Sequence, residues 1–126
     1  MSGGLWAYWN IGIAGLLGAA GVALAAVAAH RVADPSLTTA ALFLILHGAA
    51  ALALSALAGN ATWPTGFLVA GSLMLFAVSL FSGDVAARVL LGDRLFPMAA
   101  PTGGSLLIIS WLVASLSGVI SAVKSG

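Results

Sequence analysis

Four long apolar stretches, separated by short polar breaks, make up most of the chain. They cover about residues 5–29, 37–58, 66–90 and 102–123. A helix needs about 20 apolar residues to cross a hydrocarbon core roughly 30 Å thick, so each stretch is long enough to span a membrane. The first stretch carries no charge, and the third carries none before Asp84. The pattern predicts four transmembrane helices in a single domain over residues 1–126.

The breaks contain residues that end and start helices. Asp34 followed by Pro35 offers an N-cap and a first-turn proline for the second helix. Gly59 begins a short turn before the third helix, and Pro101 precedes the fourth, where Thr102 can act as N-cap. Unsatisfied peptide groups are costly in lipid, so the breaks belong at the membrane surfaces. Such short connections make neighbouring helices antiparallel, and the expected fold class is all-α, an integral membrane four-helix up-down-up-down bundle.

A cleaved signal peptide is the alternative interpretation of the first stretch. Ala26-Val27-Ala28 has the small-x-small pattern of a cleavage site. However, no Lys or Arg precedes the apolar run, and the run is longer than the roughly 7–15 residues of a typical signal. We therefore interpret this stretch as the first transmembrane helix.

Composition makes lipid the main solvent of the chain. Hydrophobic residues account for 62% of the sequence and charged residues for only 6%, whereas soluble domains carry about 25% charged residues. Membrane lipids are therefore the expected partners. The net charge is +1 without a basic cluster, which argues against a nucleic-acid partner. Without cysteine, the chain has no disulfide, thiolate nucleophile or Cys-ligated metal.

Aromatic and basic residues predict an orientation. Four aromatic residues fall on one side of an antiparallel bundle, at the depth that interfacial rings prefer: Trp6, Tyr8, Trp9 and Trp63. Three arginines fall on the other side: Arg31, Arg88 and Arg94. Only Lys124 lies beside the termini. Because cytoplasmic loops are enriched in basic residues, both termini are expected on the non-cytoplasmic side.

His47 is the ionisable residue expected deep in the membrane. It lies roughly 16 Å from the surface where the second helix begins, at ordinary helical rise. Residues of similar depth on other helices complete a candidate polar core: His47, Ser79, Ser110 and Trp111. An intramembrane histidine suggests a proton relay or ligand site. The lack of a carboxylate at this depth favours instead a neutral ring that bonds a hydroxyl, the Trp111 indole or a carbonyl.

A second polar group is expected near the arginine-rich surface. We call it the charged-side cluster, and its members are His30, Arg31, Asp84 and Arg88. Arg88 follows Asp84 by four residues on the same helix face, which predicts an ion pair that His30 or Arg31 can join. The functional alternative is a charged mouth of a small polar pathway. The structural ion pair is favoured, because charges near helix ends reach water at low cost.

Neither a cofactor nor a metal is expected. His30 and His47 differ in depth by roughly 15 Å at helical rise, so they cannot ligate one haem iron or one metal ion together. The sequence offers no nucleophile–base set and no paired carboxylates, so an enzyme is not expected either.

Small residues in the first and fourth helices predict close helix contacts. The expected packing residues are Gly15, Gly18, Gly21, Gly103 and Gly104. Small residues let backbones approach, and this drives helix association in lipid. In the first helix they serve the bundle itself or a homodimer face, and Gly18→Leu is expected to disrupt packing. Gly103-Gly104 lacks the lysine of a phosphate-binding loop, so we interpret it as a tight helix start.

Several of these segments, in this order, carry a family resemblance. They are Gly15 to Gly21 leading to Ala29-His30, His47 with Gly48-Ala49-Ala50, Phe81-Ser82-Gly83, and Pro101-Thr102-Gly103-Gly104 running to Trp111. Over nearly the whole chain the sequence resembles the small bacterial inner-membrane proteins catalogued as domain of unknown function 423, also called YgdD-like. The resemblance implies a multi-pass protein of the bacterial inner (plasma) membrane, with transmembrane protein 256 as a eukaryotic relative. It implies no activity.

The sequence departs from the family pattern at two places. After Phe81-Ser82-Gly83 the family usually has Ser-Leu-Tyr, whereas this chain has Asp84-Val85-Ala86. Before the mid-helix histidine the family often has Tyr-Gln, whereas this chain has Leu42-Phe43-Leu44. A role that depends on the family's Ser-Leu-Tyr or Tyr-Gln side chains is therefore not carried over to this sequence.

Two functional hypotheses follow. The first is a structural or accessory membrane protein, which acts through helix–helix contacts in a homo-oligomer or a larger membrane complex. The alternative is a small-solute or proton transporter or channel subunit that uses His47 and the Asp84 region.

Overall fold

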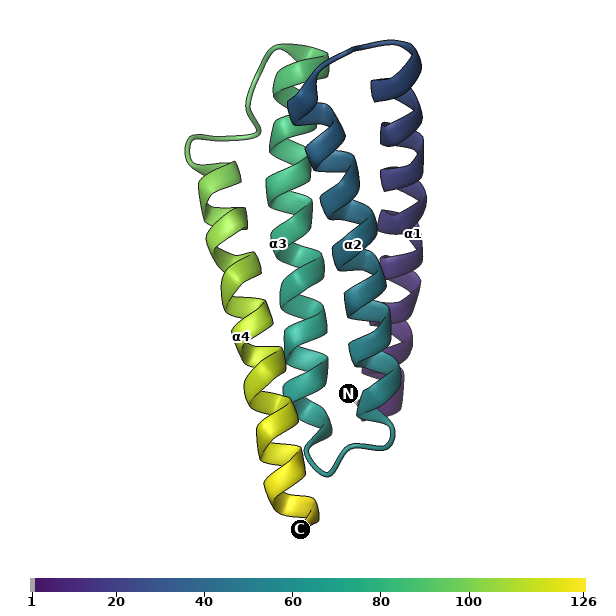
Figure 1. Cartoon of the computed structure of the whole chain (residues 1–126), viewed down its shortest axis with the longest axis vertical. Coiled ribbons are helices and arrows are strands. Elements are labelled where there is room, and N and C mark those ends of the chain that lie inside the picture. Colours follow the sequence, from purple (N-terminus) through teal and green to yellow (C-terminus); the bar gives the residue numbers. More distant parts are fainter. Residues whose placement is uncertain (1) are drawn as a thin grey trace.

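The computed structural model is a bundle of four antiparallel helices (Figure 1). They are α1 (Gly3–His30), α2 (Pro35–Ala58), α3 (Pro64–Leu91) and α4 (Ala99–Ser125). The structure describes residues 2–126, so Met1 of the predicted domain lies outside it. All four helices are long and apolar enough to cross a membrane, as expected for a multi-pass membrane protein. The predicted fold class, an all-α four-helix bundle, is confirmed.

The helices begin and end at residues with recognisable capping chemistry. The Asp34 side chain accepts a hydrogen bond from the main-chain N–H of Ser36 at 2.8 Å, with Pro35 as the first residue of α2. Gly92 ends α3 in the left-handed conformation, with φ of 81°, which a residue without Cβ adopts at little cost. At α4 the sequence expectation is wrong. The helix begins at Ala99, three residues early, so Thr102 lies inside it and is not the N-cap.

The central helices are α2 and α3, and α1 and α4 pack against them from outside. The main helix pairs are α1 with α2, α2 with α3, and α3 with α4, with a smaller contact between α1 and α3. About half of the membrane span of α3 is buried (50%), against 17% in α4 and 11% in α1. Both termini lie at the same end of the bundle (Figure 1). The outer helices therefore present most of their surface to lipid or to another protein.

Two glycines allow neighbouring helices to approach at backbone distance. A Cβ on Gly21 would lie 2.7 Å from the Ile45 side chain on α2. A Cβ on Gly103 would lie 2.6 Å from the main-chain nitrogen of Phe81 and 2.8 Å from the Ala77 oxygen on α3. A larger residue at Gly103 must push α3 and α4 apart, whereas one at Gly21 must displace the Ile45 side chain and crowd the Ala41 carbonyl oxygen of α2, 3.1 Å away.

The other three expected packing glycines have more space around them. A Cβ on Gly15 or Gly18 would meet nothing within 4 Å, and one on Gly104 would make an ordinary contact with the Phe81 ring at 3.8 Å. Gly18 approaches α2 only through its backbone, since a Cβ on Gly48 of α2 would lie 3.5 Å from the Gly18 nitrogen. A side chain at Gly18 would point out of the bundle, which removes the reason to expect that Gly18→Leu breaks it.

Candidate functional site

His47 and Trp111 join α2 to α4 by a side-chain hydrogen bond about halfway along the bundle, where Trp111 is 46% exposed and so does not lie in the predicted polar core. The His47 side chain is 4% exposed. Its Nδ1 lies 2.9 Å from the Phe43 carbonyl oxygen, and its Nε2 lies 3.1 Å from Nε1 of the Trp111 indole. An indole N–H can only donate, so Nε2 accepts and Nδ1 donates to Phe43. The ring is therefore a neutral tautomer with both nitrogens engaged, the bonding that the sequence favoured for this position.

Aromatic rings surround this hydrogen bond. The Phe43 ring lies 5.4 Å from the His47 ring and is stacked on Phe81 of α3 at 4.9 Å between centroids. The Trp111 ring meets His47 edge-on at 5.9 Å. Offset and edge-on ring contacts add to the energy of apolar burial. The environment of His47 is thus apolar apart from its two hydrogen-bond partners.

The two serines of the predicted polar core lie elsewhere. Ser110 is buried, but its hydroxyl donates to the Leu107 carbonyl of its own helix at 2.7 Å. Ser79 is exposed, and its hydroxyl donates to the Leu75 carbonyl at 2.7 Å. Both hydroxyls bond to a main-chain carbonyl of their own helix, as serines in apolar helices commonly do. Of the four candidates, the structure brings together only His47 and Trp111.

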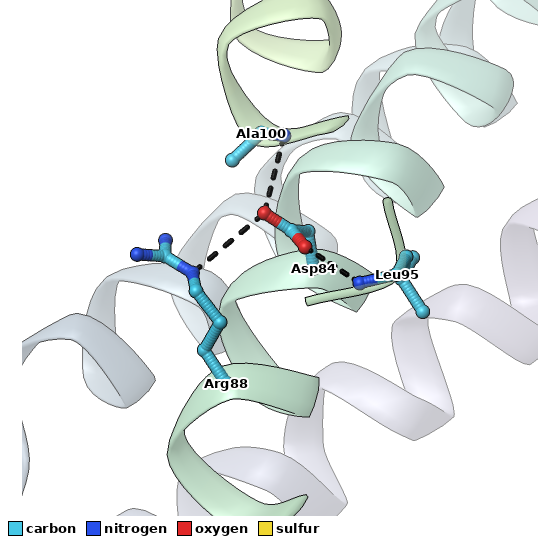
Figure 2. Close-up of polar contacts among 4 residues, drawn as sticks. All are labelled: Asp84, Arg88, Leu95 and Ala100. Atoms are coloured by element: carbon cyan, nitrogen blue, oxygen red, sulfur yellow. Dashed lines mark hydrogen bonds and ion pairs between the residues drawn. The ribbon is translucent and has the colours of Figure 1, made fainter. Parts of the chain in front are cut away.

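Asp84 fastens the start of α4 to α3 (Figure 2). Its side chain is 2% exposed. One carboxylate oxygen accepts from the Leu95 N–H at 2.9 Å, and the other accepts from the Ala100 N–H at 3.2 Å. Arg88 Nε lies 3.6 Å from the second oxygen. Met98, the N-cap residue of α4, makes no side-chain cap. Asp84 therefore supplies from α3 the anion and acceptor that a helix N-terminus favours.

The rest of the charged-side cluster does not join Asp84. His30 and Arg31 are exposed at the end of α1, and within residues 2–126 neither makes a side-chain hydrogen bond or ion pair. The reason is geometric: α1 packs on α2 and α3, whereas Asp84 faces the start of α4. Arg94, in the loop before α4, lies closer to the site.

His47 and Asp84 line the same surface groove, which we call the α2–α4 groove. It has a volume of about 910 Å³ and is lined by Phe43 and His47 of α2, Phe81, Asp84 and Arg88 of α3, Arg94 of the loop, and Gly104, Ile108 and Trp111 of α4. The groove exists because α4 packs mainly on α3 and leaves space beside α2. Trp111 and His47 mark its deep end, and the two arginines mark its mouth. Within residues 2–126, no three His, Asp or Glu side chains lie together as a metal site.

A family model described as "Protein of unknown function (DUF423)" matches residues 16–104. The chain belongs to the DUF423 family. The family resemblance noted in the sequence is thereby confirmed. The match includes His47 and Asp84 and ends before Trp111. No solved structure matches this DUF423 protein.

Sequence reasoning missed a polar link between α1 and α3 of this DUF423 protein. The Asn10 side chain is buried, donates to the Leu68 carbonyl at 3.3 Å and accepts from the Ser72 hydroxyl at 2.9 Å. The same hydroxyl accepts from the Trp6 indole at 2.7 Å. The signal was available, since Asn10 is the one amide side chain in an apolar first helix. Interhelical amide bonds of this kind fix helix register in membranes.

Proposed function

We propose that this DUF423 protein is an accessory protein of the bacterial inner membrane, which acts through contacts made by its helices inside the bilayer and not by catalysing a reaction. The four apolar helices and the family membership are consistent with a small membrane protein. The more specific role rests on how the polar groups are used and on which surfaces remain free.

The observation that carries the proposal is that three buried polar side chains of the spans each join two helices. Asn10 links α1 to α3, Ser82 donates to the Ala40 carbonyl of α2 at 2.8 Å, and His47 links α2 to α4. Of the buried side-chain N and O atoms in residues 2–126, only the hydroxyls of Ser55 and Ser121 have no partner. A catalytic site needs a nucleophile or base with a free partner position, and hydroxyls without a nearby base do not supply one.

The outer surfaces supply the contacts that such a role requires. Leu16 on α1 is 73% exposed, and its neighbour Gly15 has open space beside it. Gly12, one helical turn before Leu16 on the same face, also has open space beside it, and small residues on a helix face allow another helix to approach closely. The partner is a second copy of the chain or a subunit of a larger membrane complex. The arginines at the opposite end from the termini support an orientation with both termini outside the cytoplasm.

Transport has less support from the geometry. Both nitrogens of His47 and both carboxylate oxygens of Asp84 already have partners. A proton or ion pathway needs groups that can exchange partners along a continuous polar line. The α2–α4 groove that joins the two residues has instead a mainly apolar lining between helices.

Site-specific photo-crosslinking in native membranes tests the proposal. A benzophenone side chain at Leu16 of α1 is compared with one at Phe76 of α3, since both positions are large, apolar and exposed (73% and 58%). We expect one discrete protein adduct from Leu16, identified by mass spectrometry and reproduced with the purified pair, and none from Phe76. Lipid adducts alone at both positions would contradict the proposal. So would a solute or proton flux in proteoliposomes that His47→Ala abolishes.

A further inference from the structure

We propose that the α2–α4 groove binds one anionic phospholipid, whose acyl chain lies between the helices and whose phosphate is held by Arg88 and Arg94. This goes beyond the accessory role, because it concerns a different face of the bundle from the exposed surface of α1. It assigns a ligand class to a groove that the helix contacts leave open.

The groove has the length of one membrane leaflet. Ala100 lines it near the mouth and Trp111 lines its deep end. These positions are separated by roughly 16 Å along α4 at ordinary helical rise. Half of a hydrocarbon core roughly 30 Å thick is a similar length. A single acyl chain entering from the charged surface would therefore end where the His47–Trp111 hydrogen bond lies.

The lining fits a hydrocarbon chain and not a polar solute. Phe43, Phe81 and Ile108 supply apolar walls, and the volume of about 910 Å³ falls within the roughly 300–1,000 Å³ of ordinary ligand sites. At the deep end, His47 has no nitrogen left to bind a polar ligand. A polar molecule would lose its hydration there without gaining partners.

The mouth has the charge that an anionic headgroup requires. The carboxylate of Asp84 is engaged by the N–H groups of Leu95 and Ala100, and Arg88 meets it only through Nε. Figure 2 shows the two terminal nitrogens of Arg88 directed away from Asp84. Arg94 lines the same mouth, is exposed and has no ion-pair partner within residues 2–126, whereas neighbouring Asp93 does not line the groove. Guanidinium groups bind phosphate oxygens through paired hydrogen bonds.

Native mass spectrometry of the full-length protein tests the proposal, with phosphatidylglycerol and phosphatidylcholine of identical acyl chains as probes. We expect one phosphatidylglycerol to be retained in preference to phosphatidylcholine. Arg94→Gln is expected to lower the affinity for phosphatidylglycerol roughly fivefold, the effect of one basic residue near a membrane surface. Arg31→Gln is the matched control, because it removes the same charge at the same end of the bundle but outside the groove.

A second pair of variants tests the acyl-chain part separately. Ile108→Trp places a bulky ring in the groove and is expected to reduce lipid retention, whereas Ile109→Trp, on the next exposed position of α4 but outside the groove, leaves it unchanged. Equal retention of the two lipids, equal effects of Arg94→Gln and Arg31→Gln, or undiminished binding to Ile108→Trp would each overturn the proposal. So would a neutral lipid or a protein helix found in the groove. These outcomes are independent of the adducts formed at Leu16.

Discussion

The Asp84 carboxylate on α3 accepts a hydrogen bond from the main-chain N–H of Ala100, in the first turn of α4, at 3.2 Å. A residue of one transmembrane helix thus caps the next helix, sixteen positions later in the chain. The same carboxylate holds the loop through Leu95 at 2.9 Å. The separation between α3 and α4 at this end of the bundle, and with it the width of the groove mouth, therefore depends on this buried side chain together with the close approach of Gly103 to α3.

Replacing Asp84 with alanine should destabilise the bundle. The change leaves two main-chain N–H groups without their acceptor and removes the anion at the start of α4, at an expected cost of about 1–3 kcal/mol. Thermal unfolding in a mild detergent, followed by helical circular dichroism, measures the effect. The matched control is Asp93→Ala, which removes an exposed carboxylate nine positions along the chain. Equal unfolding temperatures for the two variants would show that Asp84 does not cap α4.

Alanine substitutions at two glycines should have opposite effects. At Gly103 the new Cβ would lie 2.6 Å from a backbone atom of α3, so Gly103→Ala should cost about 1–3 kcal/mol through overpacking. At Gly18 the new Cβ meets nothing within 4 Å, and the higher helix propensity of alanine should leave stability unchanged or raise it by up to about 1 kcal/mol. Unfolding of both variants under identical detergent conditions makes the comparison. A larger loss at Gly18 than at Gly103 would contradict the helix contacts described above.

The hydrogen bond between His47 and Trp111 should be detectable as a coupling energy. Replacing either residue by phenylalanine removes the bond while keeping a ring in place. In a double-mutant cycle of the two substitutions we expect a coupling of about 1 kcal/mol, as for other interhelical hydrogen bonds in membranes. Leu112→Phe, an exposed change on the same helix, serves as the control partner and should show no coupling to His47. A His47–Trp111 coupling as small as that control would mean that the two rings only lie near each other.

The number and direction of the helices could be predicted from the sequence, because each is set by a single physical constraint. The thickness of the bilayer sets the length of each span, and short breaks leave little choice of direction. Helical rise also placed Trp111 at the depth of His47, and the structure joins them. The hydrophobic pattern alone did not predict which face of α1 is buried, because that helix is apolar on nearly every side and carries no periodic signal apart from Asn10. This is why Gly18 and Gly21 could not be told apart.

The sequence predicted one of the contacts of Asp84 but not the other two. The spacing to Arg88 predicted the ion pair, which is present at 3.6 Å. The stronger partners are main-chain N–H groups of residues 95 and 100, and their position depends on how the loop after Gly92 folds back. Loops carry no hydrophobic repeat that would fix such a path. The groove beside α2 has the same origin, since it depends on where the loop places α4.

Removing the amide of Asn10 should loosen α1 without affecting the groove. Asn10→Leu keeps the branched shape and the number of side-chain heavy atoms but deletes the bonds to the Leu68 carbonyl and the Ser72 hydroxyl, at an expected cost of about 1 kcal/mol. Because these bonds join α1 to α3, hydrogen–deuterium exchange should quicken in the first half of α1, whereas retention of phosphatidylglycerol should stay at the wild-type level. Ser105→Ala is a useful comparison, since its hydroxyl bonds only the Pro101 carbonyl of its own helix and should leave exchange in α1 unchanged. If Asn10→Leu quickened exchange in α4 as much as in α1, the two outer helices would be coupled through the bundle, and the lipid-binding face could not be treated as independent of the α1 face.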